Sequence, residues 1–71
     1  MINKILQYHR KKHRNRYTQQ QLSIKIGVAP SAVSNWESGK VAIPGDAVVR
    51  LCLELEIDPN QLFGWYNIYK D

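Results

Sequence analysis

The 71-residue sequence has little that would cross-link a fold or hold it in a membrane. Its single cysteine, Cys52, cannot form an internal disulfide, so we expect a core held by packing alone and a reducing compartment. No apolar run approaches the roughly 18 residues of a transmembrane helix, and the first residues lack the apolar segment of a secretory signal. We therefore expect one small cytoplasmic domain, near the lower size limit for a core without disulfides or metals.

Acidic residues are nearly absent from the first half of the chain. Residues 1–40 hold eight basic residues against one acid, Glu37, whereas residues 41–71 hold two basic residues against five acids. A one-sided positive field suits a polyanionic partner, because each phosphate that is neutralised releases counterions. A solvated basic surface without a partner is the alternative that composition leaves open.

Signals of catalysis are missing as well. The sequence has no acid pair placed for a cleft, no Cys–His arrangement with an orienting group and no glycine-rich phosphate loop. His9 and His13 have a spacing that can hold a metal on a helix, but the cations around them repel a metal ion. We expect no enzyme activity, cofactor, small-molecule substrate or metal, and we expect both histidines to face solvent or phosphate. The basic first helix lacks the aromatic anchors of a membrane-surface helix, so no membrane partner is expected.

The stretch from Thr18 to Lys40 reads TQQQLSIKIGVAPSAVSNWESGK and predicts two short helices joined by a glycine turn. Thr18 and Gln21 have the spacing of a capping box, which begins a helix. Gly27 suits the left-handed residue that follows the helix end. This order of helix, tight turn and helix is the layout of a helix-turn-helix, whose second helix enters the DNA major groove.

The second helix of this pair is expected over residues 30–38, with Pro30 at its first position. Val33 and Trp36 would face inward, which leaves a short polar face outside. Asparagine on such a face can form two hydrogen bonds with adenine in the major groove. An ordinary surface helix with small polar residues is the competing interpretation of this face, which consists of Ser31, Ala32, Ser34 and Asn35.

Three further helices complete the expected core. Apolar spacing predicts a first helix over residues 3–12. Pro44 and Asp46 begin a fourth helix, and Asp58 with Gln61 caps a short fifth helix. The residues expected to face the core from these three helices are Ile2, Ile5, Leu6, Val48, Leu51, Cys52, Leu55, Leu62 and Phe63.

The motif resembles the Cro/C1-type (XRE) helix-turn-helix family of phage and bacterial repressors. The resemblance implies an all-α, compact five-helix, lambda-repressor-like domain over residues 1–63, with the helix-turn-helix at residues 18–38. It also implies binding of operator double-stranded DNA, usually as a homodimer on a pseudo-palindrome. The residues that carry the resemblance are Thr18-Gln19, Leu22, Gly27-Val28, Ser31, Val33-Ser34, Trp36-Glu37 and Gly39-Lys40.

Residue roles follow from the same resemblance. Glu37 would pair with a basic residue of the first helix, for which Arg10 is the first candidate and Lys12 the second. Pro30 stands where many relatives have a polar residue, and its apolar contact with a thymine methyl is a possible substitute. The implied base-reading residues are Pro30, Ser31, Ser34 and Asn35. The implied phosphate contacts are Gln19, Ser38 and Lys40. Arg14 and Arg16, from the basic stretch at residues 9–16 (HRKKHRNR), are expected to join them.

The C-terminal tail, residues 64–71 (GWYNIYKD), is unusually rich in large apolar groups. It is expected either to extend the fifth helix over the core or to form a dimer contact, because aromatic residues are enriched in interfaces. The dimer residues would be Phe63, Trp65, Tyr66 and Tyr69. The chain being the DNA-binding part of a longer protein is a further possibility. The second functional hypothesis is a protein-interaction module, such as an antitoxin or an assembly adaptor, that keeps this fold and uses the aromatic tail.

Overall fold

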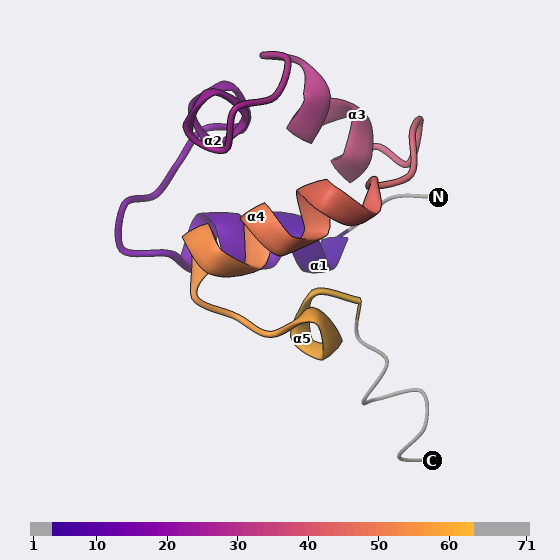
Figure 1. Ribbon diagram of the computed structural model, residues 1–71. Helices are drawn as coiled ribbons and strands as arrows, with labels where there is room; N and C mark the ends of the chain where they lie inside the picture. Colours follow the sequence, from indigo (N-terminus) through magenta and orange to yellow (C-terminus); the bar gives the residue numbers. More distant parts are fainter. Residues whose placement is uncertain (1–3, 64–71) are drawn as a thin grey trace.

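Five helices follow one another along residues 4–63, the part of the chain that the computed structural model describes. They are α1 (Lys4–Lys12), α2 (Gln19–Lys25), α3 (Ala32–Glu37), α4 (Gly45–Leu55) and α5 (Pro59–Phe63). In Figure 1, α2 and α3 lie at one end of the molecule, α5 lies at the other, and α1 and α4 lie between them. The described residues contain no strand, and the expected all-α, five-helix fold is confirmed.

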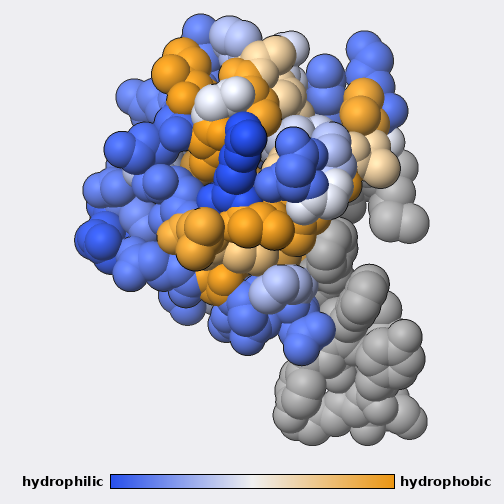
Figure 2. Space-filling model, viewed as in Figure 1, coloured by the Kyte–Doolittle hydropathy of each residue, from blue (hydrophilic) through white to orange (hydrophobic). Residues whose placement is uncertain are grey.

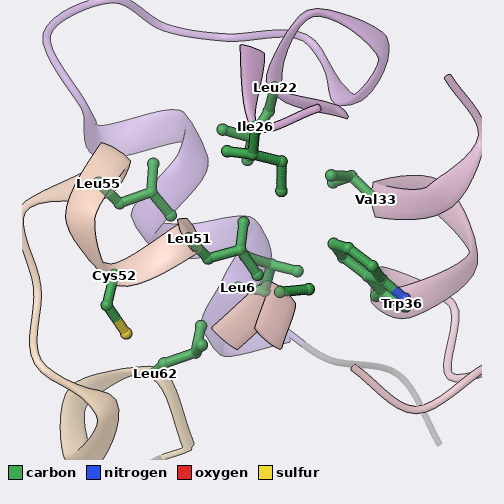
Figure 3. Packing of buried hydrophobic residues seen from close by; sticks show 10 residues of the cluster. Leu6, Leu22, Ile26, Val33, Trp36, Leu51, Cys52, Leu55 and Leu62 are labelled. Atoms are coloured by element: carbon green, nitrogen blue, oxygen red, sulfur yellow. The ribbon is translucent and has the colours of Figure 1, made fainter. Parts of the chain in front are cut away.

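One apolar core receives a fully buried side chain from every helix (Figure 3). Burying an aliphatic side chain of this size contributes roughly 1.5–3 kcal/mol each relative to leaving it in water. The five residues that fill the centre, one from each helix in order, are Leu6, Leu22, Val33, Leu51 and Leu62. Around them lie the other members of the core, which are Ile26, Trp36, Ala47, Cys52 and Leu55.

One expectation about inward-facing residues, that for Ile5, was wrong, and α4 also buries a residue that was not expected. The buried residues of α1 are Leu6 and Arg10, four positions apart, so Ile5 falls beside that face and keeps 37% of its surface exposed. On α4, Val48 packs against the core as expected, although it is only partly buried, and Ala47 is buried as well. Ile2 and the side chain of Phe63 lie outside the described residues.

The ends of α4 and α5 follow local sequence rules. Asp58 Oδ1 accepts a hydrogen bond from the Gln61 N–H at 2.8 Å, and Gln61 Oε1 accepts one from the Asp58 N–H at 2.9 Å. This is the capping box expected for α5. Pro44 is the N-cap of α4, and Asp46 lies in the first turn, where the helix dipole favours an acid. Glu56 ends α4 in the left-handed conformation, at φ 59°.

Apolar side chains also remain on the surface. Figure 2 shows apolar surface over α4 and also at the end of the molecule that holds α2 and α3. On α4, Val49 is 58% exposed and Leu53 is 76% exposed. Within residues 4–63, no helix has both the length and the apolar character needed to cross a membrane.

Candidate nucleic-acid interface

The first helix of the pair, α2, begins at a complete capping box. The Thr18 hydroxyl accepts a hydrogen bond from the Gln21 N–H at 3.0 Å, and the Gln21 side-chain oxygen accepts one from the Thr18 N–H at 2.9 Å. Two N–H groups that a helix start leaves without helical partners are satisfied in this way. Thr18 therefore fixes the start of α2 at the expected position.

The turn after α2 depends on a left-handed glycine. Gly27 has φ 80°, and a Cβ built there would meet no atom closer than 3.6 Å, so conformation rather than space requires glycine. The Val28 N–H donates to the Ser23 carbonyl at 3.0 Å, which closes the helix end. The Arg50 guanidinium of α4 donates to the Ile26 carbonyl at 3.3 Å. No local signal in the sequence indicates this last contact, because Arg50 lies 24 positions further along the chain.

A buried serine joins the two helices of the motif. Ser23 is fully buried in α2, and its hydroxyl donates to the Gln19 carbonyl at 2.9 Å within the same helix. The same oxygen accepts a hydrogen bond from the Val33 N–H of α3 at 3.1 Å. In the sequence, Ser23 is recognisable only as a small residue that lets a neighbouring helix approach closely. The structure adds a direct polar link between them.

The second helix, α3, presents a polar face on the side away from the core. Val33 and Trp36 are buried, whereas Ser31 is exposed and Ser34 and Asn35 are half-buried. Within the described part of the chain, the side chains of Ser31, Ser34 and Asn35 form no hydrogen bonds. Their hydroxyl and amide groups are therefore free to bind an external partner. Ala32 differs from its expected outward position, because it packs partly against the core.

The start of α3 differs from the sequence prediction. The helix begins at Ala32 with Ser31 as its N-cap, two residues after the predicted start. Pro30 lies in the preceding turn, where the Ala32 N–H donates to the Ala29 carbonyl at 2.9 Å. Proline suits the first helical position in general, but here the chain closes a short turn first. Pro30 remains exposed beside the polar face of α3.

Arg10 and Glu37 are brought together by the fold. Arg10 Nε lies 2.6 Å from Glu37 Oε2, and the second guanidinium nitrogen donates to Glu37 Oε1 at 3.0 Å. Arg10 also donates to the Tyr17 carbonyl at 2.9 Å. Both side chains of the pair are more than nine-tenths buried. Arg10 therefore ties α1 to the end of α3 and to the link before α2, and it is not available to a phosphate.

The expected phosphate-binding residues differ in how many hydrogen-bond donors remain unused by contacts within the protein. Lys40 and Arg16 are exposed, and no contact of their charged groups is found among the described residues. Arg14 is exposed but donates to Glu56 Oε2 at 2.5 Å. The Gln19 amide donates one hydrogen to Glu37 Oε1 at 2.9 Å and keeps the other. The Ser38 hydroxyl donates to the Asn35 carbonyl at 3.1 Å, so it must rotate before it can donate to a phosphate.

His13 departs from the expected solvent or phosphate contact. Its side chain is 5% exposed and stacks on the Tyr17 ring, with 5.5 Å between the ring centroids. Nδ1 accepts a hydrogen bond from the Asn15 N–H, so the ring proton of the neutral imidazole lies on Nε2. Nε2 lies 3.3 Å from Glu56 Oε2. The link between α1 and α2, residues 13–18, is therefore packed against the end of α4. The contact between His13 and Glu56 spans 43 positions of sequence.

Among the residues that the structure describes, three groups have pKa values shifted from their ordinary values. The pKa of Glu56 is lowered below its ordinary 4.5, first by the hydrogen bond from Arg14 and also by its charge. The pKa of Tyr17 is raised above 10.0 because its hydroxyl donates to the Glu54 carboxylate. Burial raises the pKa of the Cys52 thiol, so this cysteine is a core residue with little thiolate. Among residues 4–63, no cluster of His, Cys, Asp or Glu side chains has the makings of a metal site.

Comparison with known proteins agrees with this geometry. A family profile described as "Helix-turn-helix" matches residues 6–62, which is most of the chain. The chain belongs to this family. It is a Cro/C1-type (XRE) helix-turn-helix protein, and the family comprises DNA-binding regulators of transcription rather than enzymes. No match was found among curated proteins or among solved structures.

Proposed function

We propose that this protein is a transcriptional repressor that binds a pseudo-palindromic operator as a homodimer, with α3 in the major groove. The observation that carries the proposal is the division of α3 into two faces. Val33, Trp36 and Glu37 are buried, whereas the polar groups of Ser31, Ser34 and Asn35 have no partner within the described residues. A helix whose inner face is packed against the core and whose outer face carries unbonded polar groups suits direct readout of base edges.

Asn35 is the principal base-reading residue in this proposal. Its free amide supplies the donor and acceptor that adenine N7 and N6 require, and two such bonds discriminate adenine from the other bases. Ser31 and Ser34 add single hydrogen bonds. Pro30, exposed in the turn before α3, offers an apolar surface to a thymine methyl. Because this reading face is small, sequence-dependent DNA shape contributes much of the specificity, and phosphate contacts fix the register in which that shape is read.

The DNA backbone is held by residues around the reading face. Lys40 lies three residues after the end of α3 and is exposed, which supports it as the principal phosphate contact. The remaining amide hydrogen of Gln19 supports a second contact at the start of α2. Arg14 retains unused guanidinium donors beyond its bond to Glu56, and Arg16 has no competing acid among the described residues. Ser38 joins them once its hydroxyl turns away from the Asn35 carbonyl.

Dimer formation would place two copies of α3 about one helical turn apart on the same face of the DNA. The proposed dimer residues Trp65, Tyr66 and Tyr69, and the side chain of Phe63, lie outside the described part of the chain. Among the described residues, the exposed Val49 and Leu53 of α4 add apolar surface that supports contact between copies. A second copy doubles the number of base contacts, which compensates for the small reading face of each.

The decisive experiment is selection of bound sequences from a random pool of double-stranded DNA. We expect enrichment of one inverted repeat, with half-sites about 10 base pairs apart from centre to centre. Footprinting on the enriched site should then protect both half-sites. A reporter with the site overlapping its promoter should lose expression when the protein is present. Failure to enrich any sequence would reject sequence-specific binding, and protection of one half-site at saturation would reject the dimer.

The protein-interaction hypothesis predicts a different pattern of mutational effects. Under that hypothesis, Asn35→Ala and Ser31→Ala leave all binding unchanged, whereas Trp65→Ala abolishes it. Under the proposed function, the two changes on α3 weaken DNA binding and relax base preference. DNA binding by the two α3 variants on the selected site tests the proposed function, whereas loss of binding to a protein partner by Trp65→Ala alone would favour the interaction hypothesis.

A further inference from the structure

We propose that Ser23 is a positioning residue for base recognition, because it caps α3 in place of Ser31 and so leaves the Ser31 hydroxyl free for DNA. This inference rests on the proposed function, because Ser31 is assigned as a base-reading residue only there. The capping exchange itself is a property of the fold and is measurable without DNA.

The start of α3 lacks the side-chain cap that its sequence offers. Serine is among the best N-cap residues, since its hydroxyl can accept from the N–H groups of the first turn. Ser31 occupies the N-cap position, yet its side chain makes no such bond. Its backbone has φ −93° and ψ −1°, whereas a capping residue usually adopts the extended conformation, as Thr18 does at φ −72° and ψ 165°.

The missing cap is supplied from the neighbouring helix. The Val33 N–H, which an N-cap hydroxyl would normally satisfy, donates instead to Ser23 Oγ at 3.1 Å. Ser23 is fully buried, so this N–H has an acceptor that water cannot replace. The hydroxyl proton of Ser23 is used by the Gln19 carbonyl, which aims the lone pairs of Oγ at α3. One side chain thus holds α2 and α3 together and satisfies the start of α3.

The consequence for recognition concerns the Ser31 hydroxyl. If that hydroxyl capped α3, its lone pairs would be directed at Val33 and its backbone would move to the extended conformation. With Ser23 in place, Ser31 stays exposed and unbonded beside Ser34 and Asn35. We therefore expect that removing the Ser23 hydroxyl draws Ser31 into the capping role and withdraws it from the DNA.

A double-mutant comparison of thermal stability tests the capping exchange. Ser31→Ala alone should change the melting temperature little, because Ser31 caps nothing in the native fold. Ser23→Ala should lower it by about 5–10 °C, since the polar link between α2 and α3 is lost and the Val33 N–H exchanges a buried acceptor for an exposed one. In the Ser23→Ala background, Ser31→Ala should lower it by a further few degrees, because Ser31 has become the cap. Ser34→Ala, a serine change inside α3, should have the same small effect in both backgrounds.

DNA binding supplies a readout that a purely structural role would not change. On the selected operator, Ser31→Ala should lose preference at one base position, and Ser23→Ala should lose preference at that same position although it retains Ser31. The preference assigned to Asn35 should persist in both variants. Ser23→Cys, which fills the same space with a weaker acceptor, should give an intermediate result and serves if Ser23→Ala folds poorly.

Additive melting temperatures in the double-mutant comparison would overturn the proposal. Retention of full base preference by Ser23→Ala would overturn it as well. If the native protein selects no DNA sequence, the proposed function fails, and the thermal comparison alone still decides whether Ser23 has taken over the cap from Ser31.

Discussion

Arg10 and Glu37 lie 27 positions apart, and their side chains form a two-point ion pair between α1 and the end of α3. The side chain of Arg10 is 8% exposed and that of Glu37 is 4% exposed. Gln19 and the Tyr17 carbonyl satisfy further donors and acceptors of the same pair. The orientation of the proposed reading helix is therefore coupled to a buried charge pair that requires both partners.

We predict that Arg10→Met destabilises the fold by about 3–5 kcal/mol, because it leaves the Glu37 carboxylate buried without its counter-charge. The change keeps a long side chain in place, so loss of charge rather than loss of volume is measured. Urea denaturation followed by circular dichroism gives the free energy of unfolding. The matched control is Arg14→Met, which removes an exposed pair with Glu56 and should cost much less, because solvent screens that pair. Equal costs for the two variants would contradict the importance of burial.

Local rules allowed most of the scaffold to be predicted from the sequence. The capping boxes at Thr18 and Asp58 and the left-handed turn at Gly27 depend on neighbouring residues alone, and they occur where they were expected. The predicted start of α3 was wrong because the first turn of that helix is capped by Ser23, which lies ten positions before Val33 in the sequence. The prediction for His13 was wrong for a similar reason. Its basic neighbours in the sequence indicate an exposed side chain, whereas Glu56 at the end of α4 lies against it in the fold.

The proposed site is less predictable than the scaffold. Sequence similarity places Ser31 and Asn35 on the outer face of α3, but it does not indicate which side chains keep a free hydrogen-bonding group. The Gln19 amide donates a hydrogen bond to Glu37 within the fold, and the Ser38 hydroxyl donates one to the Asn35 carbonyl. Such competition between internal and external partners depends on three-dimensional distances that no motif encodes.

A pH prediction follows from the lowered pKa of Glu56. Because its pKa is lower in the folded state than in the unfolded state, Glu56 stabilises the fold above pH 4.5, the ordinary value, and this contribution is lost as the pH falls through the folded pKa. Glu56→Gln should therefore reduce the melting temperature near neutral pH and have a progressively smaller effect below pH 4.5. Thermal unfolding of both proteins between neutral and acidic pH measures the difference. A difference that grows toward acid would have the opposite sign to this linkage.

A salt prediction concerns Lys40. Operator binding should weaken steeply with salt, because several cations each displace counterions from a phosphate. Lys40→Ala should reduce the slope of log affinity against log salt by about 1, whereas Lys40→Arg should preserve the slope. Fluorescence anisotropy on the selected operator at a series of salt concentrations gives both slopes. A shallow slope for the native protein would remove Lys40, Arg14 and Arg16 from the proposed phosphate contacts.

The last prediction concerns Asn35, whose amide has no hydrogen-bond partner within residues 4–63. Asn35→Ala should weaken operator binding by about 1–3 kcal/mol and remove the preference at one base position of each half-site. The fold should persist, since Asn35 is half-buried and its backbone carbonyl still accepts from the Lys40 N–H. The control is Asn60→Ala, the same change at an exposed position of α5, which should leave affinity and preference unchanged. If Asn35→Ala lowers affinity equally for all sequences, Asn35 supports the backbone contact and another residue reads the base.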